Sequence, residues 1–94
     1  MTIPDYQTVM LPLLKLVAKF GQIKMSDVTQ LIADEFRLTE EERRELLPSG
    51  KQPIIQNRVA WARTYLKKAG LLDSPQRGVI EISDRGKLRP VWVH

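Results

Sequence analysis

The chain has 94 residues and is 43% hydrophobic, enough for one core that covers about two-thirds of the unfolded surface, so we expect a single domain over 1–94. It has no cysteine and one histidine, His94, which excludes disulfides, thiol nucleophiles and imidazole-rich zinc sites, and we expect no cofactor. Lys15 and Lys19 interrupt the most apolar stretch, and the first residues lack the features of a signal peptide. We therefore expect a cytoplasmic protein without a membrane partner.

The positive charge of the chain is concentrated in its second half. Residues 1–50 carry six Lys or Arg against eight Asp or Glu, whereas residues 51–94 carry nine against three. A one-sided positive surface attracts polyanions such as DNA. The alternative is that these basic residues only keep a small domain in solution.

Between residues 5 and 20, apolar positions recur at spacings of three and four and predict a helix with one buried stripe. The stripe consists of Val9, Leu13, Leu16, Val17 and Phe20. Gly21 is placed to end the helix. Pro12 lies inside the stripe, so the helix either starts near Pro12 or bends there.

Two shorter helices are predicted next. Ser26 and Asp27 form a good helix start, and the apolar positions that follow predict a helix ending near Arg37. Thr39 and Glu42 form a capping-box pattern, which predicts a short helix through residue 47 ended by residues 48–50. The acidic run 40–45 includes an i,i+4 pair with an arginine, so we expect a solvated face there and not a metal site.

Residues 53–69 read as the longest uninterrupted helix. One apolar strip is formed by Ile55, Val59, Ala62, Leu66 and Ala69. Trp61 and Tyr65 flank the strip, and we expect them to belong to the core and not to stack on bases. Gly70 is placed to cap the helix in a left-handed conformation.

A hairpin follows this helix directly. Residues 71–74 and 79–82 are predicted strands, joined by Pro75-Gln76-Arg77-Gly78, with a turn at residues 83–86 and an apolar tail from 88 to 93. A basic helix followed at once by a basic hairpin is typical of a winged helix-turn-helix. We therefore predict a mainly α fold with a small β-hairpin, of the winged helix-turn-helix class, that binds double-stranded DNA.

The polar side of the long helix supplies the candidate contacts. The candidate DNA-binding residues are Lys51, Gln52, Gln56, Asn57, Arg58, Arg63, Thr64, Lys67 and Arg77. Gln56 and Asn57 suit adenine, and Arg63 suits guanine or a phosphate. Thr64 and Lys67 are placed to touch the backbone further along the helix.

The remaining candidates lie at either end of the helix. Lys51 and Gln52 precede its start, where free backbone N–H groups favour a phosphate, and Arg77 lies at the hairpin tip. Arg58 has two roles open, because its guanidinium is equally suited to an acidic residue of an earlier helix. Trp92, in the tail, is suited either to the core or to a partner.

Catalysis is not expected from these residues. A metal-dependent nuclease of the restriction type needs clustered carboxylates near a lysine, and no Asp/Glu-x-Lys sequence occurs in the chain. The glycines are dispersed, so there is no phosphate-cradling loop, and no base partner is available for a hydroxyl nucleophile.

Several segments together resemble the N-terminal domain of Mrr-type restriction proteins. These segments are Pro4-Asp5-Tyr6, Leu11-Pro12-Leu13-Leu14, Leu47-Pro48-Ser49-Gly50, Asn57-Arg58-Val59-Ala60-Trp61-Ala62, Tyr65-Leu66-Lys67-Lys68-Ala69-Gly70-Leu71, Arg77-Gly78 and Gly86. The resemblance implies a winged helix that precedes a nuclease domain and recognises DNA, including DNA with modified bases. It does not carry cleavage over to these residues, because the family's nuclease domain would begin after them.

From the residues and the resemblance together, we expect a non-catalytic DNA-binding module that targets an Mrr-like type IV restriction endonuclease, with a nuclease domain in cis or in trans as partner. The alternative is a protein-interaction module, a homodimer included, with no direct DNA contact. The apolar tail at Leu88, Val91, Trp92 and Val93 motivates that alternative.

Overall fold

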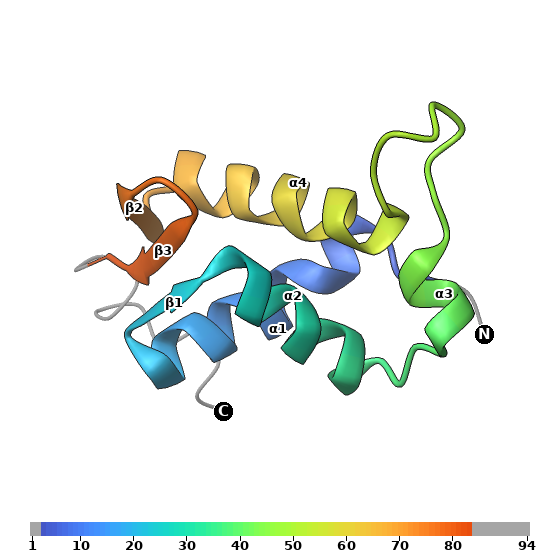
Figure 1. The fold of residues 1–94 in the computed structure, drawn as a ribbon. Helices are drawn as coiled ribbons and strands as arrows, with labels where there is room; N and C mark the ends of the chain where they lie inside the picture. Colours follow the sequence, from blue (N-terminus) through green and yellow to red (C-terminus); the bar gives the residue numbers. More distant parts are fainter. Residues whose placement is uncertain (1–2, 84–94) are drawn as a thin grey trace.

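The computed structural model describes residues 3–83, so the predicted turn after Ser83 and the apolar tail lie outside the described residues. The elements in chain order are α1 (Tyr6–Phe20), β1 (Gln22–Lys24), α2 (Met25–Glu35), α3 (Glu40–Arg44), α4 (Ile54–Lys68), β2 (Leu72–Gln76) and β3 (Val79–Ile82), as drawn in Figure 1. The fold is mainly helical with a small antiparallel sheet of three strands. None of the described helices is long and apolar enough to cross a membrane.

Helix α1 is one continuous helix that contains Pro12, so the first of the two predicted alternatives, a start near the proline, is wrong. The carboxylate of Asp5 caps its N-terminus by accepting a hydrogen bond from the Thr8 N–H at 2.8 Å. Gly21 ends it as predicted, with its N–H donating to the Val17 carbonyl. Phe20, expected in the buried stripe, is 52% exposed, because it lies in the last turn where the chain leaves the core.

Helix α2 begins at Met25, one residue earlier than predicted, and its preceding residue makes no side-chain cap. Helix α3 has the predicted capping box between Thr39 and Glu42. It ends at Arg44 and not at residue 47, because Glu45 is already extended and Leu46 forms a β-bridge with Pro53.

Helix α4 spans all but the first and last residues of the predicted 53–69. Gly70 has a φ of 79° and donates to the Lys67 carbonyl, while the Leu71 N–H donates to the Leu66 carbonyl. This pair of bonds is the Schellman arrangement, which requires a left-handed residue at Gly70 as predicted. The cap turns the chain at once into β2.

The sheet has the order β1-β3-β2, and its third strand, β1, was not predicted from the sequence. Ile23 of β1 pairs with Ile80 of β3, so this three-residue strand is held by its partner and not by its own pattern. Pro75 lies within the edge strand β2, where a missing N–H is tolerated. The turn is therefore only Arg77 and Gly78, shorter than the predicted four residues, and Gly78 has a φ of 76°.

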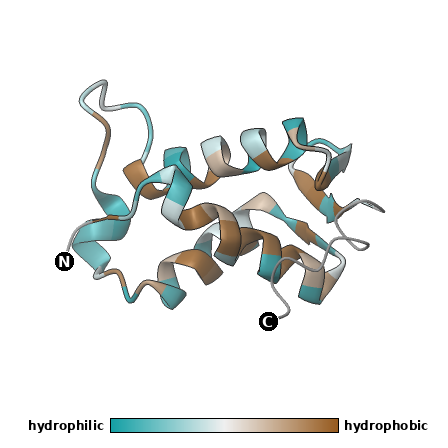
Figure 2. Ribbon diagram, turned by 180° about the vertical axis from the view of Figure 1, so that it is seen from behind, coloured by the Kyte–Doolittle hydropathy of each residue, from teal (hydrophilic) through white to brown (hydrophobic). Residues whose placement is uncertain are grey.

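Helices α1, α2 and α4 enclose one hydrophobic core, and strand β3 closes it at one side. Figure 2 shows hydrophobic colouring along α1 and hydrophilic colouring over α3 and at the C-terminal end of α4. Ile55, Val59, Ala62 and Leu66 of the predicted α4 strip are buried, but Ala69 is exposed. The core prediction for Trp61 and Tyr65 is wrong, because these side chains are 48% and 39% exposed.

Candidate nucleic-acid interface

Helix α4 carries four basic side chains and no acidic one. The ion pairs found among residues 3–83 join Arg43 to Asp34 at 2.7 Å and Arg44 to Glu40 at 3.5 Å, and both involve α3. The positive charges of α4 are therefore not neutralised by a carboxylate in ion-pair contact within the described part of the chain. That leaves them available to an external polyanion.

The side of α4 nearest α2 brings together several predicted contacts. Gln56, Ala60, Arg63 and Lys67 follow one another at spacings of three and four, so they form one stripe along the helix. Gln56 and Lys67 are exposed. The Nε of Arg63 is buried and has no hydrogen-bond partner among the described residues. A guanidinium nitrogen without a partner gains a hydrogen bond if the Arg63 side chain turns to meet an acceptor such as a phosphate oxygen.

The loop between α3 and α4 protrudes from the body of the domain (Figure 1). A bond from the Leu47 N–H to the Gln52 carbonyl, 2.9 Å long, closes its base, and Lys51 is exposed within it. Asn57 is tied to this end of the helix: its amide donates to the Gln52 side chain at 3.5 Å and accepts from Arg58 at 3.1 Å. These bonds use one amide hydrogen and one oxygen lone pair of Asn57, so one donor and one acceptor position of the side chain remain for a base.

Arg58 does not lie in the stripe formed by Gln56, Ala60, Arg63 and Lys67. Hydrogen bonding by Thr8, first from its N–H and then from its side chain, holds the pKa of the Asp5 carboxyl below its ordinary value, and the charge of Arg58 adds to this. Arg58 therefore lies near the start of α1, on the other side of α4. Of its two predicted roles, this position favours the electrostatic contact with an earlier element.

Thr64 and Arg77 complete the predicted set. The Thr64 hydroxyl donates to the Ala60 carbonyl at 2.9 Å, so only its acceptor capacity is free for a ligand. Arg77 is exposed at the hairpin tip. The tip lies beside the start of α2, because the Met25 N–H donates to the Gly78 carbonyl at 2.8 Å.

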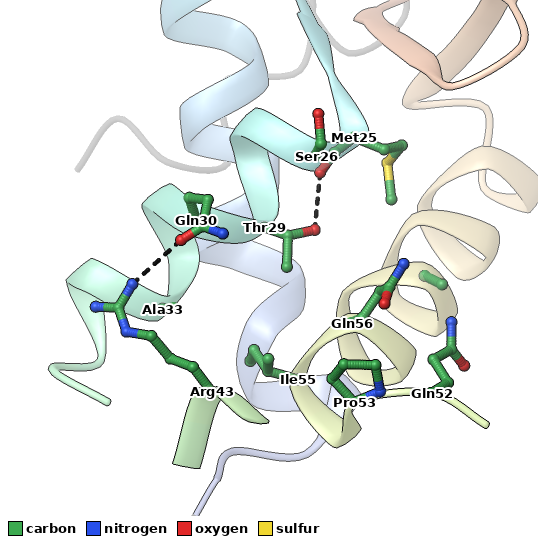
Figure 3. A pocket seen from close by; sticks show the side chains of 11 residues that line it. Met25, Ser26, Thr29, Gln30, Ala33, Arg43, Gln52, Pro53, Ile55 and Gln56 are labelled. Atoms are coloured by element: carbon green, nitrogen blue, oxygen red, sulfur yellow. Dashed lines mark hydrogen bonds between the residues drawn. The ribbon is translucent and has the colours of Figure 1, made fainter. Parts of the chain in front are cut away.

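A cavity of about 350 Å³ opens between α2 and the first half of α4 (Figure 3). It is lined by Met25, Ser26, Thr29, Gln30, Ala33, Arg43, Gln52, Pro53, Ile55, Gln56 and Ala60. Sequence reasoning singled out none of the α2 residues, because the pairing of α2 with α4 brings them to this place. The half-buried Met25 and the exposed Ser26 carry no signal in the sequence that separates them from other residues of a helix start.

A partly exposed aromatic cluster lies on the opposite side of α4. The rings of Tyr6 and Tyr65 are stacked with centroids 4.9 Å apart, and Trp61 is tilted against Tyr65 at 6.1 Å. The Lys68 ammonium lies 5.7 Å from the Tyr65 ring. Sequence reasoning missed this surface, because aromatic residues beside an apolar strip are ordinarily assigned to the core.

Comparison with known proteins decides the family. The family model described as the Mrr N-terminal domain matches residues 6–89. The chain belongs to the Mrr N-terminal domain family. The resemblance predicted from its motifs is thereby confirmed. No solved structure gives a significant match to this Mrr N-terminal domain.

A curated relative supports the same family. The type IV methyl-directed restriction enzyme EcoKMrr of Escherichia coli (strain K12) is 37% identical to this Mrr N-terminal domain over 79 residues, which are 83% of this chain and 26% of the relative. The match thus spans about a quarter of the length of the restriction enzyme.

The acidic run in this Mrr N-terminal domain behaves as a solvated face. Glu40, Glu41 and Glu45 are exposed, and Glu40 makes the predicted i,i+4 pair with Arg44. Among residues 3–83 no group of three or more His, Cys, Asp or Glu side chains is arranged to hold a metal ion.

Proposed function

We propose that this Mrr N-terminal domain is a winged helix that binds duplex DNA, with α4 in the major groove and the β2–β3 hairpin against the flanking backbone. The element order supports this assignment: a helix, a short strand, further helices ending in α4, and then a hairpin that pairs with the short strand. Its 15 residues give α4 a length of about 22 Å, and a helix about 10–12 Å across fits a major groove about 12 Å wide.

The observation that carries the proposal is a set of basic side chains on and around α4 that form no ion pair with a carboxylate among residues 3–83. Arg63 and Lys67 lie in the stripe nearest α2, Lys51 is exposed at one end of the helix and Arg77 at the hairpin tip. Such an arrangement is suited to phosphates along a groove, with base edges between them.

We further propose that the domain delivers a nuclease of the Mrr type to modified DNA in the cytoplasm and does no chemistry itself. Its relative is named as a methyl-directed restriction enzyme. The nuclease partner would act in cis or in trans. Metal-dependent cleavage of DNA by the purified 94-residue chain would contradict this division of labour.

The salt dependence of duplex binding tests the proposal. If about four to six basic side chains meet phosphates, log affinity falls against log salt with a slope of roughly −4 to −5. We expect the Arg63→Glu, Lys67→Glu double variant to bind much more weakly with a slope flatter by about two. Fluorescence anisotropy with a labelled duplex measures both. A flat salt response, or no binding at low salt, would refute the proposal.

A second candidate is a protein-interaction module, a homodimer included, and the cluster of the exposed Trp61 and Tyr65 with the half-buried Tyr6 favours it. Exposed aromatic side chains of this kind are enriched at protein interfaces. In this case the chain would self-associate in sedimentation velocity, Trp61→Ser would abolish the association, and the double charge reversal would leave it intact. Full DNA binding by the charge-reversal variant would favour this second candidate over the first.

A further inference from the structure

We infer that the cavity between α2 and α4 is where this domain reads a methyl group on the major-groove edge of a base. The inference rests on the proposed function, since it requires α4 to lie in the major groove. It adds to the proposed recognition of modified DNA the place in the fold where the modification is read, a cavity that takes an uncharged base edge carrying a methyl group.

The lining of the cavity suits such a ligand better than a phosphate. Among residues 3–83, Arg43 is the only charged residue of the lining, and its guanidinium donates to the Leu38 carbonyl at 3.1 Å, to Gln30 at 3.3 Å and to Asp34 at 2.7 Å. That cation is therefore already neutralised by an ion pair. What the cavity offers instead is the thioether of Met25, methyl and methylene groups, and neutral amides and hydroxyls. These groups match the mixed apolar and hydrogen-bonding edge of a base.

The position of the cavity places it where base edges would pass. Figure 3 shows the side chains of Met25, from α2, and Gln56, from α4, pointing toward one another. Ala60 lines the same cavity and lies in one stripe with Arg63 and Lys67, the residues proposed to hold phosphates. A duplex held by those two cations presents its major groove to Met25, Gln56 and Ala60.

The methyl group has two sources with one shared chemistry. In 5-methylcytosine it stands at the position where thymine carries its own methyl group, and in N6-methyladenine it is on the amine that faces the major groove. Either methyl group would contact Met25 and Ala60, with the Gln56 amide hydrogen-bonding to the same base edge.

The base is read in place and not extruded from the duplex. Proteins that extrude a base hold it in a pocket where side chains, often aromatic, stack on its faces. None of the residues that line this cavity is aromatic. Reading in place requires only that α4 approach the groove closely, which the small side chain of Ala60 permits.

The backbone fixes Met25 relative to the hairpin. The Met25 N–H donates to the carbonyl of Gly78 at the turn next to Arg77, with a length of 2.8 Å, and the side chain packs against the core cluster. The hairpin contact with the DNA backbone and the methyl contact of Met25 therefore share one rigid frame.

Binding of the 94-residue chain to three pools of random-sequence duplex tests the inference. One pool is unmodified, one carries 5-methylcytosine at every cytosine and one carries N6-methyladenine at every adenine. We expect about three- to tenfold tighter binding to one methylated pool, the range for burying one methyl group and its immediate contacts. The pool that is preferred identifies the source of the methyl group.

The Ala60→Leu variant fills the mouth of the cavity. We expect the ratio of its affinities for the methylated and unmodified pools to fall below about twofold. The ratio is the readout because a bulkier side chain at Ala60 also hinders the approach of α4 to every duplex, which lowers both affinities alike. Ala69→Leu is the matched control, because it adds the same atoms at an exposed position at the end of α4, outside the cavity. This control should keep the preference.

A second measurement needs no variant, so it decides the matter if Ala60→Leu fails to fold. With 13C-labelled methionine methyl groups, the Met25 resonance should differ between the complexes with methylated and unmodified pools, and that of Met10, on α1 and outside the cavity, should not. Tight binding with equal affinity for all three pools, or a preference that Ala60→Leu retains, would overturn the inference and leave DNA binding intact. Failure to bind any pool would instead overturn the proposed function.

Discussion

The two sides of α4 differ in what they offer, although they belong to one helix and share one core. The side nearest α2 carries Gln56, Ala60, Arg63 and Lys67 beside a neutral cavity. The side nearest α1 carries the aromatic cluster of Trp61 and Tyr65 with Tyr6.

The difference shows how one short helix can present two surfaces, one available to a ligand and one that packs against α1. On the first side the Nε of Arg63 has no hydrogen-bond partner among residues 3–83, and the side chains of Gln56 and Lys67 are exposed, so these polar groups can turn to a ligand. On the second side the groups are engaged with α1, through ring stacking of Tyr65 on Tyr6 and through the charge of Arg58 near Asp5. We expect substitutions on the first side to change binding and those on the second side to change stability or association.

The largest effect should come from the core that both sides share. Leu66 is 3% exposed beneath α4, and Leu66→Ala should lower the free energy of unfolding by about 2–5 kcal/mol. Because a small domain has little stability to spare, both DNA binding and any self-association should weaken together. Chemical denaturation followed by circular dichroism measures the loss. A variant as stable as the original chain would show that the core beneath α4 is wrongly described.

Charge reversal on each side of α4 separates ligand binding from packing against α1 most directly. We expect Arg63→Glu to weaken binding of an unmodified duplex about tenfold or more at low salt, because it replaces an attraction to phosphate by a repulsion. Arg58→Glu, the same substitution on the side of Asp5, should weaken it less. Anisotropy titrations of the two variants at one salt concentration give the comparison. Equal losses would mean that DNA covers both sides of α4.

Removal of the ring stack tests the second side. Tyr65→Ala loses the stack on Tyr6, and such aromatic pairs are worth about 0.5–1.5 kcal/mol beyond the area they bury. We expect a lower melting temperature with nearly unchanged DNA affinity. Tyr65→Phe, which keeps the ring, is the matched control and should melt near the original temperature. A loss of DNA affinity at unchanged stability would place the ring in the interface.

The smallest effect concerns pH. Hydrogen bonding by Thr8 and, to a lesser degree, the charge of Arg58 hold the pKa of Asp5 below its ordinary value of 3.8. The folded state therefore favours the carboxylate, and this contribution to stability is present above pH 3.8 and is lost as the pH falls below it.

Asp5→Asn keeps an oxygen that can accept the Thr8 N–H but does not titrate. We expect the stability of this variant to fall less between pH 5 and about pH 3 than that of the original chain. Melting temperatures across this range measure the difference. If the melting temperatures of the variant and of the original chain fall in parallel, Asp5 does not contribute to the loss of stability at low pH.

Much of the local structure could be predicted from the sequence, since it depends on near neighbours. The capping box of Thr39 and Glu42 and the left-handed Gly70 each follow from interactions within a few residues, and both are confirmed. Strand β1 could not be predicted this way, because its ladder partner lies more than fifty residues further along the chain, in β3.

The same distinction holds for the candidate site: the kinds of residue on α4 could be predicted from the sequence, but their tertiary contacts could not. The basic, acid-free character of α4 is visible in its residues, and so are Arg63 and Lys67 as candidates. Three other features depend on which elements pack beside α4. Arg58 lies near Asp5, Asn57 is hydrogen-bonded to Gln52, and Trp61 is exposed. An apolar strip read from periodicity gives the centre of the buried face but not the width that neighbouring helices cover.

By itself, the sequence determined the helices, the hairpin, the family and the concentration of positive charge around one helix, because propensity, capping and charge are properties of the residues and their near neighbours. Only the tertiary structure decided which side of that helix meets α2 and which meets α1. It thereby created a cavity lined by Met25, Gln56 and Ala60 on one side and exposed an aromatic cluster on the other. Surfaces of this kind come from elements distant in sequence, whose meeting is dictated by burial of the whole core and not by any local pattern.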